Sequence, residues 1–242
     1  MKLIIIRHAD PDYSIDSLTP TGWKEAGLLA ERVAKWEVTD FYVSPLGRAR
    51  DTAGVSLEKM GREATVLDWL REFPTRVPHE GDPDKTCCWD WLPAEWTEQE
   101  AFYHRDRWME EAHFAASTAR EDYQRVTRGL DELLARYGYQ RERNYYRVTR
   151  PSSDTVVLFC HFGLECVLLS HLLNISPMVL WHALCAAPTS VTTIYTEERR
   201  EGIASFRMAA FGDTSHLYVA GVEPSKSARF CERFDNVDER HD

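Results

Sequence analysis

The feature that most constrains the fold is Leu3–Ile6, a short continuous apolar run rich in β-branched side chains. Such a run predicts a β-strand that is covered on both faces, as the strands of parallel sheets are. The run stops at Arg7 and His8, so two polar side chains follow the strand directly. Ligands of open α/β sheets bind at the carboxyl ends of the strands. We therefore expect Arg7 and His8 at the ligand-binding edge of a sheet.

Strand signals recur along the chain and alternate with helix signals. The further segments that predict strands are Asp40–Val43, Ala64–Leu67, Thr155–Cys160, Ser190–Thr196 and Ala204–Ala210. This alternation predicts an α/β fold, a three-layer sandwich with a mostly parallel central sheet flanked by helices. A chain of 242 residues can form this fold as one domain over residues 1–242.

The helices that follow the first two strands each begin at a hydroxyl residue followed by proline. Thr19 precedes Pro20 and Ser44 precedes Pro45, which suits the N-cap and the first helical position. Arg48 lies in the first turn of the second helix, off its apolar stripe. Because a helix N-terminus attracts anions, Arg48 is expected beside an anion-binding helix end.

The segment from Pro74 to about Arg150 has a different pattern, without a strong strand signal. It holds four of the eight tryptophans and two helical stretches, about Thr97–Ala116 and Glu121–Tyr137. We expect a helical cap insertion over about 74–150 that covers the ligand edge of the sheet. The alternative is that these helices pack on the sheet as ordinary crossovers. Packing of the lobe is a simpler role for its tryptophans than stacking on a base or a sugar.

Net charge and hydropathy limit which classes of partner and which cellular location the sequence predicts. The net charge is −10, whereas nucleic-acid-binding domains usually carry a basic excess, so we expect no nucleic-acid partner. The longest apolar stretches fall short of the roughly 18–20 residues of a membrane-spanning helix. The N-terminal apolar run is also too short for a signal peptide. We therefore expect a cytoplasmic protein that does not contact membranes.

Metal ligands and cofactor motifs receive little support from the sequence. The six cysteines, at positions 87, 88, 160, 166, 185 and 231, have no CxxC spacing, which favours reduced thiols over a zinc site or a disulfide framework. His79, Glu80, Asp82 and Asp84 could be read as a metal cluster, but exposed acidic loops are far commoner. We expect no metal and no cofactor.

Polar residues from three elements are expected to meet at one edge of the sheet. Arg7 and His8 follow the first strand, Arg48 opens a helix, and His161 follows the strand Thr155–Cys160. Guanidinium groups and helix-terminal amides suit a phosphate dianion. A neutral imidazole is also a competent nucleophile toward phosphorus. Each residue alone is more simply an exposed polar residue, but the combination predicts a phosphoryl site.

Five segments resemble motifs of one known family, in order and across nearly the whole chain. Arg7-His8-Ala9 is similar to an RHG motif, and residues 44–53 are similar to an SPLxRAxxTA segment. Residues 18–22 resemble an LTxxG helix start, residues 160–163 a later HG turn, and residues 212–217 a segment near the C-terminus. These motifs are those of the histidine phosphatase (phosphoglycerate mutase-like) superfamily.

The resemblance implies a role for each site residue. His8 would be the nucleophile that forms a phosphohistidine. The phosphoryl oxygens would be held by Arg7, Arg48, His161 and the backbone amide of Phe162. The implied function is that of a metal-independent phosphatase, a hydrolase acting on a small phosphorylated metabolite.

The resemblance leaves three candidates for the proton donor. The segment around Glu72 resembles the stretch that carries the family's acid, so Glu72 would protonate the leaving alcohol and then activate water. The residues after Glu72 depart from the family pattern, however. Glu80 and Asp82 therefore remain alternatives.

Two other functions remain open. In a phosphoglycerate mutase the phosphoryl group returns to the substrate. Ser14 stands near the position where mutases carry an asparagine, which weakens this alternative. A catalytically inactive protein that binds a phosphorylated ligand is the second, because the residues after Glu72 depart from the family's pattern for the acid. Ala9 replaces the family's usual glycine and adds only a methyl group beside the nucleophile.

Overall fold

Four parallel strands form one half of the sheet in the computed structural model, which describes residues 1–227, 229 and 232–238. They lie in the order β5 (Thr65–Val66), β4 (Asp40–Val43), β8 (Thr155–Cys160) and β1 (Lys2–Arg7). In β1 and β8, Lys2 lies opposite Thr155 and Arg7 opposite Cys160. The residues that follow these two strands therefore leave the sheet side by side.

Antiparallel strands extend the sheet beyond β1, which makes it a mixed eight-stranded sheet. In order they are β9 (Val191–Arg200), β10 (Ile203–Asp213), β7 (Tyr145–Val148) and β6 (Tyr139–Glu142). The expectation of no strand between 74 and 150 is wrong at the β6–β7 hairpin. Tyr139 and Tyr146 are the buried residues of this hairpin, and their rings pack on Phe206 at 6.0 and 4.8 Å. Two buried tyrosines among charged residues do not give enough hydrophobic alternation to predict these strands from the sequence.

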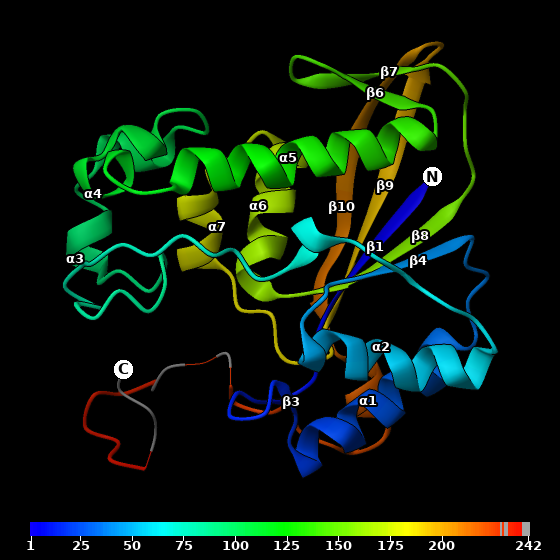
Figure 1. Ribbon diagram of the computed structural model, residues 1–242, viewed down its shortest axis with the longest axis horizontal. Coiled ribbons are helices and arrows are strands. Elements are labelled where there is room, and N and C mark those ends of the chain that lie inside the picture. The colour runs from blue at the N-terminus through cyan, green and yellow to red at the C-terminus, as the bar shows by residue number, and fades with distance from the viewer. Residues whose placement is uncertain (228, 230–231, 239–242) are drawn as a thin grey trace.

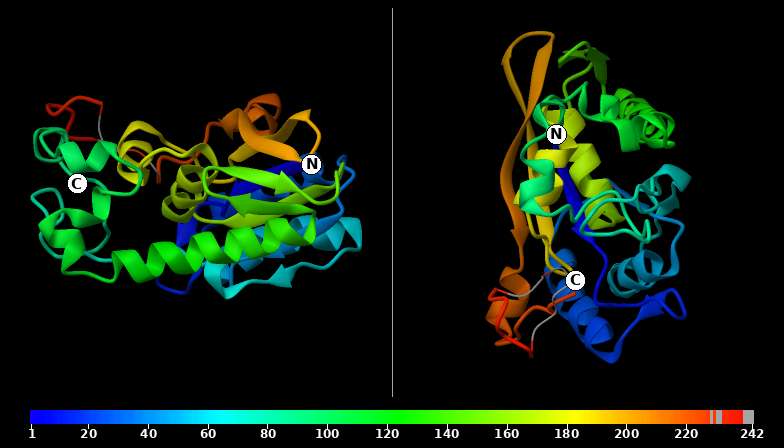
Figure 2. Two further views of the ribbon diagram at one scale, coloured as in Figure 1. Left: turned by 90° about the horizontal axis from the view of Figure 1, so that it is seen from above. Right: turned by 90° about the vertical axis from the view of Figure 1, so that its left-hand side faces the viewer.

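The two faces of the parallel strands pack against different helices, as Figures 1 and 2 show. Ile4 and Ile6 of β1 face α1 (Pro20–Val33) and α2 (Gly47–Met60), whereas Leu3 and Ile5 face the opposite layer. That layer contains α5 (Ala119–Arg136), α6 (Phe162–Leu173) and α7 (Pro177–Ala183). The predicted three-layer α/β fold is confirmed. Its two covered faces explain why the strand sequences are continuously apolar.

Residues 74–118, which precede α5, form a lobe of short elements rather than the predicted helix over Thr97–Ala116. These elements are α3 (Pro93–Trp96), η2 (Glu100–Tyr103), η3 (Trp108–Glu110) and α4 (Ala112–Ala115). Phe102 and Trp108 both pack on Phe114, at 5.7 and 5.0 Å between ring centroids. Residues six apart lie roughly 120° apart around a helix, so one straight helix could not bring these rings together.

The helix expected over Glu121–Tyr137 is observed as α5, but it packs on α6 and the sheet. The lobe that could serve as a cap is therefore shorter than the 74–150 insertion expected from the sequence. It lies at one end of the molecule in Figure 2.

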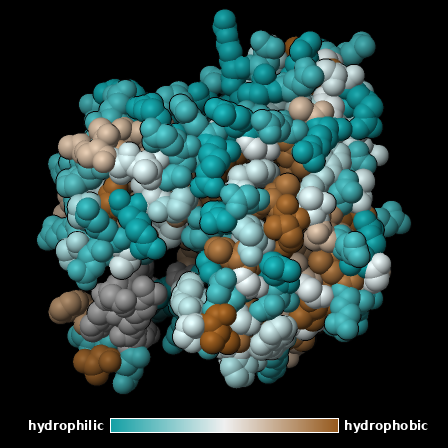
Figure 3. Space-filling model, viewed as in Figure 1, coloured by the Kyte–Doolittle hydropathy of each residue, from teal (hydrophilic) through white to brown (hydrophobic). Residues whose placement is uncertain are grey.

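The remaining elements are short. β2 (Pro11–Asp12) and β3 (Ser17–Leu18) form a small hairpin after β1, and α8 (Ser215–Val219) follows β10. Hydrophilic side chains cover most of the face shown in Figure 3. Among the described residues, no helix combines the length and apolar character needed to cross a lipid bilayer. Cys231 lies outside the described residues.

Candidate active site

His8 follows β1 and is almost fully buried, with 2% of its surface exposed. Its Nδ1 atom donates a hydrogen bond to the carbonyl oxygen of Ala9 at 2.8 Å. In a neutral imidazole this leaves the lone pair on Nε2. Burial, with a further contribution from the positive charge of Arg7, holds the pKa of His8 well below its usual range. The imidazole is therefore neutral at physiological pH, as a nucleophile must be.

Arg7 and Arg48 are both anchored by contacts that orient their guanidinium groups. Arg7 donates from Nη1 to the carbonyl oxygen of Ala186 at 2.5 Å. Arg48 donates from Nη1 to Oδ1 of Asp16 at 2.6 Å and lies over the ring of Tyr13. Positive charge held in this way is suited to phosphoryl oxygens.

The start of α2 differs from the predicted one. The helix begins at Gly47, and Ser44 is not its N-cap. Instead, Asp16 from the β2–β3 loop accepts a hydrogen bond from the Gly47 amide at 2.7 Å. A Cβ atom at Gly47 would lie 2.0 Å from the carbonyl oxygen of Asp16, so this close approach requires glycine. The loop after β1 is thereby joined to the helix that carries Arg48.

His161 follows β8 and is fully buried beside His8, with 5.1 Å between the two ring centroids. Its Nε2 atom lies 2.8 Å from Oγ of Ser44, while Nδ1 has no hydrogen-bond partner among the described residues. Burial, aided by the nearby His8 and the arginines, lowers the pKa of His161 well below its usual range. His161 therefore offers a buried ring nitrogen that a phosphoryl oxygen can engage.

Glu72 contacts the N-terminus of α6, the helix that follows His161. Its Oε1 atom accepts hydrogen bonds from the amides of Phe73 and Leu164, both at 2.8 Å. Desolvation by the surrounding protein outweighs these bonds and raises the pKa of the carboxyl group. A carboxyl group with a raised pKa retains its proton more readily, which suits a general acid. Phe162 is the first residue of α6, so its amide also lies at this helix end.

The other two candidate acids lie in the lobe rather than at this helix end. Glu80 is exposed, and its amide donates to Glu95. Asp82 accepts hydrogen bonds from the amides of Thr86 and Cys87 and so closes a turn. Of the three acidic candidates, the structure places Glu72 against α6.

Trp89 from the lobe reaches this same helix end. A Cβ atom built on Gly163 would lie 2.5 Å from Cη2 of Trp89 and 2.8 Å from Oε1 of Glu72. Trp181 donates to the carbonyl oxygen of Gly163 at 2.9 Å. The Trp89 ring and the Glu72 carboxyl group therefore meet at Gly163, whose lack of a Cβ atom makes room for both.

Sequence reasoning missed three residues near the site. The Ser44-Pro45 pair predicts a helix cap rather than a contact with His161. Asp16 lies in an irregular loop that has no helical or strand pattern. Glu165 is buried in α6, where burial raises its pKa to about 7. The one signal for Glu165 is an acidic residue in a mostly apolar helix.

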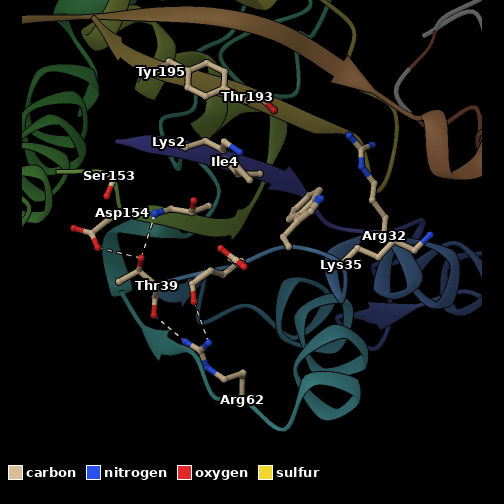
Figure 4. Close-up of a pocket in the computed structure, with 14 residues that line it drawn as sticks. Lys2, Ile4, Arg32, Lys35, Thr39, Arg62, Ser153, Asp154, Thr193 and Tyr195 are labelled. Carbon is tan, nitrogen blue, oxygen red and sulfur yellow. Dashed lines mark hydrogen bonds between the residues drawn. The ribbon is translucent and has the colours of Figure 1, made fainter. Parts of the chain in front are cut away.

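A separate pocket of about 750 Å³ lies at the opposite end of the sheet, and Figure 4 shows it. It includes Lys2 and Thr155, the first residues of β1 and β8. Arg32 in its wall pairs with Asp213 at 2.6 Å, and Arg62 donates to the carbonyl oxygen of Thr39. Because His8 follows the other end of β1, this pocket is not part of the candidate active site.

Comparisons with known proteins relate the chain to a family and to solved structures. The family model of the histidine phosphatase superfamily (branch 1) matches residues 3–208. A protein of Hydrogenobacter thermophilus, named provisionally as phosphoserine phosphatase 2, is 36% identical over 81 residues. That match spans 30% of this chain and 40% of the relative's length.

Solved structures of low sequence identity share the fold. A phosphoserine phosphatase from Entamoeba histolytica has a TM-score of 0.58 at 20% identity, covering 89% of this chain and 98% of its own. A mycobacterial glucosyl-3-phosphoglycerate phosphatase has a TM-score of 0.57 at 24% identity, covering 88% of this chain and 99% of its own. These structures share the fold, and the family match over residues 3–208 shows that the chain belongs to the histidine phosphatase superfamily.

Proposed function

We propose that this protein is a phosphatase that hydrolyses a small phosphomonoester through a phosphohistidine on His8. The observation that carries the proposal is the hydrogen bond from His8 Nδ1 to Ala9, which leaves the Nε2 lone pair free. Positive charge from Arg7 and a second buried histidine accompany this nucleophile.

In the first step, Nε2 of His8 attacks phosphorus while the bond from phosphorus to the leaving oxygen breaks. Arg7, Arg48, His161 and the Phe162 amide stabilise the charge on the equatorial oxygens. Glu72 gives its proton to the leaving alcohol. Because the positive charge comes from guanidinium groups, this step needs no metal ion.

In the second step, the Glu72 carboxylate takes a proton from water as the water oxygen attacks the phosphohistidine. The bond from phosphorus to Nε2 breaks, phosphate leaves, and His8 and Glu72 regain their starting states. Trp89 favours this assignment because its ring meets the Glu72 carboxyl group at Gly163, and an aromatic ring there helps to exclude solvent.

The substrate class is a small phosphorylated metabolite with an alcohol leaving group. The names of the relatives suggest phosphoserine and glucosyl-3-phosphoglycerate as the first compounds to test. We also propose a cytoplasmic location, since the five cysteines among the described residues form no disulfide.

An activity screen across phosphorylated metabolites, in chelator and without added metal, tests the proposal. Release of inorganic phosphate without a requirement for 2,3-bisphosphoglycerate is the expected result. An isomerised phosphate ester as the product would instead identify a mutase. Binding of phosphate esters with no turnover of any of them would identify an inactive binding protein.

A further inference from the structure

We propose that the lobe binds one divalent transition metal ion of the zinc type through His79, Asp82 and Cys87. One ligand atom from each of these three residues lies within 4.8 Å of the other two. All three lie within nine consecutive residues of the lobe, 79–87. The sequence predicted only an exposed acidic loop here, because its spacing does not reveal that Cys87 folds back onto His79.

The state of His79 is the observation that points to a ligand. Its side chain is fully buried, and neither ring nitrogen makes a hydrogen bond of good geometry to a described residue, although the Trp89 backbone lies close to the ring. The ring is held by stacking on Trp91, at 4.8 Å between centroids. Burying a polar group without a partner is costly. A metal ion on one ring nitrogen removes part of this cost.

The second ring nitrogen also has a candidate partner. Oε2 of Glu95 is buried, lacks a hydrogen-bond partner, and lies 3.8 Å from Nδ1 of His79. Histidines that bind metals usually donate their other N–H group to a carboxylate or carbonyl. Glu95 can therefore either accept this hydrogen bond or join the coordination sphere.

The backbone presents the other two ligands in ordered turns. His79 and Asp82 exchange backbone hydrogen bonds of 3.3 and 3.0 Å. Oδ2 of Asp82 binds the amides of Thr86 and Cys87, which brings the Cys87 side chain to the carboxylate and leaves Oδ1 for a metal. Asp90, whose Oδ2 lies 3.9 Å from Cys87 Sγ, or a water molecule can take a fourth position.

The ligand types select the metal. Imidazole, thiolate and carboxylate together suit zinc rather than magnesium or calcium. With metal–ligand bonds of about 2.0–2.3 Å, the ligand atoms of a tetrahedral site lie roughly 3.3–3.8 Å apart. Binding therefore draws this loop together by about 1 Å. The Cys87 thiol gives its proton to solvent as the Zn–S bond forms.

The proposed metal is structural rather than catalytic. Its ligands lie just before Trp89, whose ring meets Glu72 at Gly163. Closing the loop around the ion would fix the position of Trp89 beside the acid. The metal site can be tested without an activity assay, so it stands or falls independently of the proposed phosphatase function.

The test is zinc binding to the full-length protein after dialysis against a chelator. Wild-type protein should bind one equivalent of zinc, measured by elemental analysis after gel filtration. Cobalt in place of zinc should give a thiolate-to-metal charge-transfer band. At free zinc about 100 times Kd, the unfolding temperature should rise by roughly 5–10 °C.

Matched variants separate this site from adventitious binding. Cys87→Ser and Asp82→Asn, which change little volume, should weaken zinc binding at least tenfold, and Cys87→Ser should abolish the cobalt–thiolate band. Cys185→Ser, at an exposed cysteine outside the lobe, should retain both. His79→Ala should also lose the ion. Substoichiometric zinc in wild type, or an unchanged thiolate band in Cys87→Ser, would overturn the proposal.

Discussion

Oγ of Ser44 lies 2.8 Å from Nε2 of His161, although the two residues are 117 positions apart in the sequence. Ser44 follows β4, and His161 follows the neighbouring strand β8. The contact fixes the orientation of the His161 ring, whose Nδ1 atom has no partner among the described residues. Ser44 thus positions a proposed phosphoryl ligand without being one.

Replacement of Ser44 by alanine should lower kcat/KM by roughly 3–10-fold, the equivalent of one ordinary hydrogen bond. His161→Ala should cost more, and adding Ser44→Ala to it should cost little further, because the two act as one unit. Steady-state kinetics of the double-mutant cycle give the answer. Fully additive losses would mean that Ser44 acts separately from His161.

Arg48 should be required for transition-state stabilisation. Arg48→Ala, like Arg7→Ala, should lose on the order of 10²–10³-fold in kcat/KM, as when one donor to a developing charge is removed. Lysine should restore only part of this, because it lacks the bidentate guanidinium fork. Asp16→Asn keeps one acceptor oxygen for Arg48 but loses the charge and the bond from the Gly47 amide, so it should cost less than Arg48→Ala. Full activity in Arg48→Ala would place the phosphoryl group elsewhere.

Glu72 should matter in proportion to how poor the leaving group is. Glu72→Gln should slow phosphohistidine formation from an alkyl phosphate by about 10²–10⁴-fold. The same step should be spared for p-nitrophenyl phosphate, because nitrophenolate leaves without a proton. Single-turnover kinetics with both substrates separate these rates. Equal slowing with both would show that Glu72 positions the substrate rather than protonating it.

The pH profile of kcat/KM for an alkyl phosphate follows from two opposite pKa shifts. Activity requires neutral His8, which is present above its lowered pKa, and protonated Glu72, which is present below its raised pKa. Protonation of His8 should therefore reduce kcat/KM only below pH 6.5. Deprotonation of Glu72 should reduce kcat/KM only above pH 4.5. Glu72→Gln should remove the alkaline limb; its persistence would assign that limb to another group.

The sequence predicted the parallel half of the fold well because buried strands leave a strong signal. Asp40–Val43 and Thr155–Cys160 are observed with the predicted bounds. The lobe could not be predicted in the same way. Its aromatic residues at 102, 108 and 114 meet through tertiary packing that no single helical or strand period describes.

The residues of the candidate site fall into the same two groups, those that follow buried strands and those that lie in loops. Arg7, His8 and His161 follow buried strands, so their convergence could be expected from sequence. Asp16 and Trp89 reach the site from loops, and no periodic pattern places loop residues in space. Contacts of this kind depend on the whole fold.

The most direct test of the central claim is to look for phosphate bound to His8. Wild-type protein is mixed with a phosphate ester that it hydrolyses and is quenched rapidly under alkaline denaturing conditions. Intact-mass spectrometry should then show the gain of one phosphoryl group. Peptide mapping should locate this group on His8. His8→Ala should show neither the mass increase nor turnover, while Cys185→Ser should behave as wild type. Turnover in His8→Ala at a rate near that of wild type, or a phosphoryl group on another residue, would contradict the account.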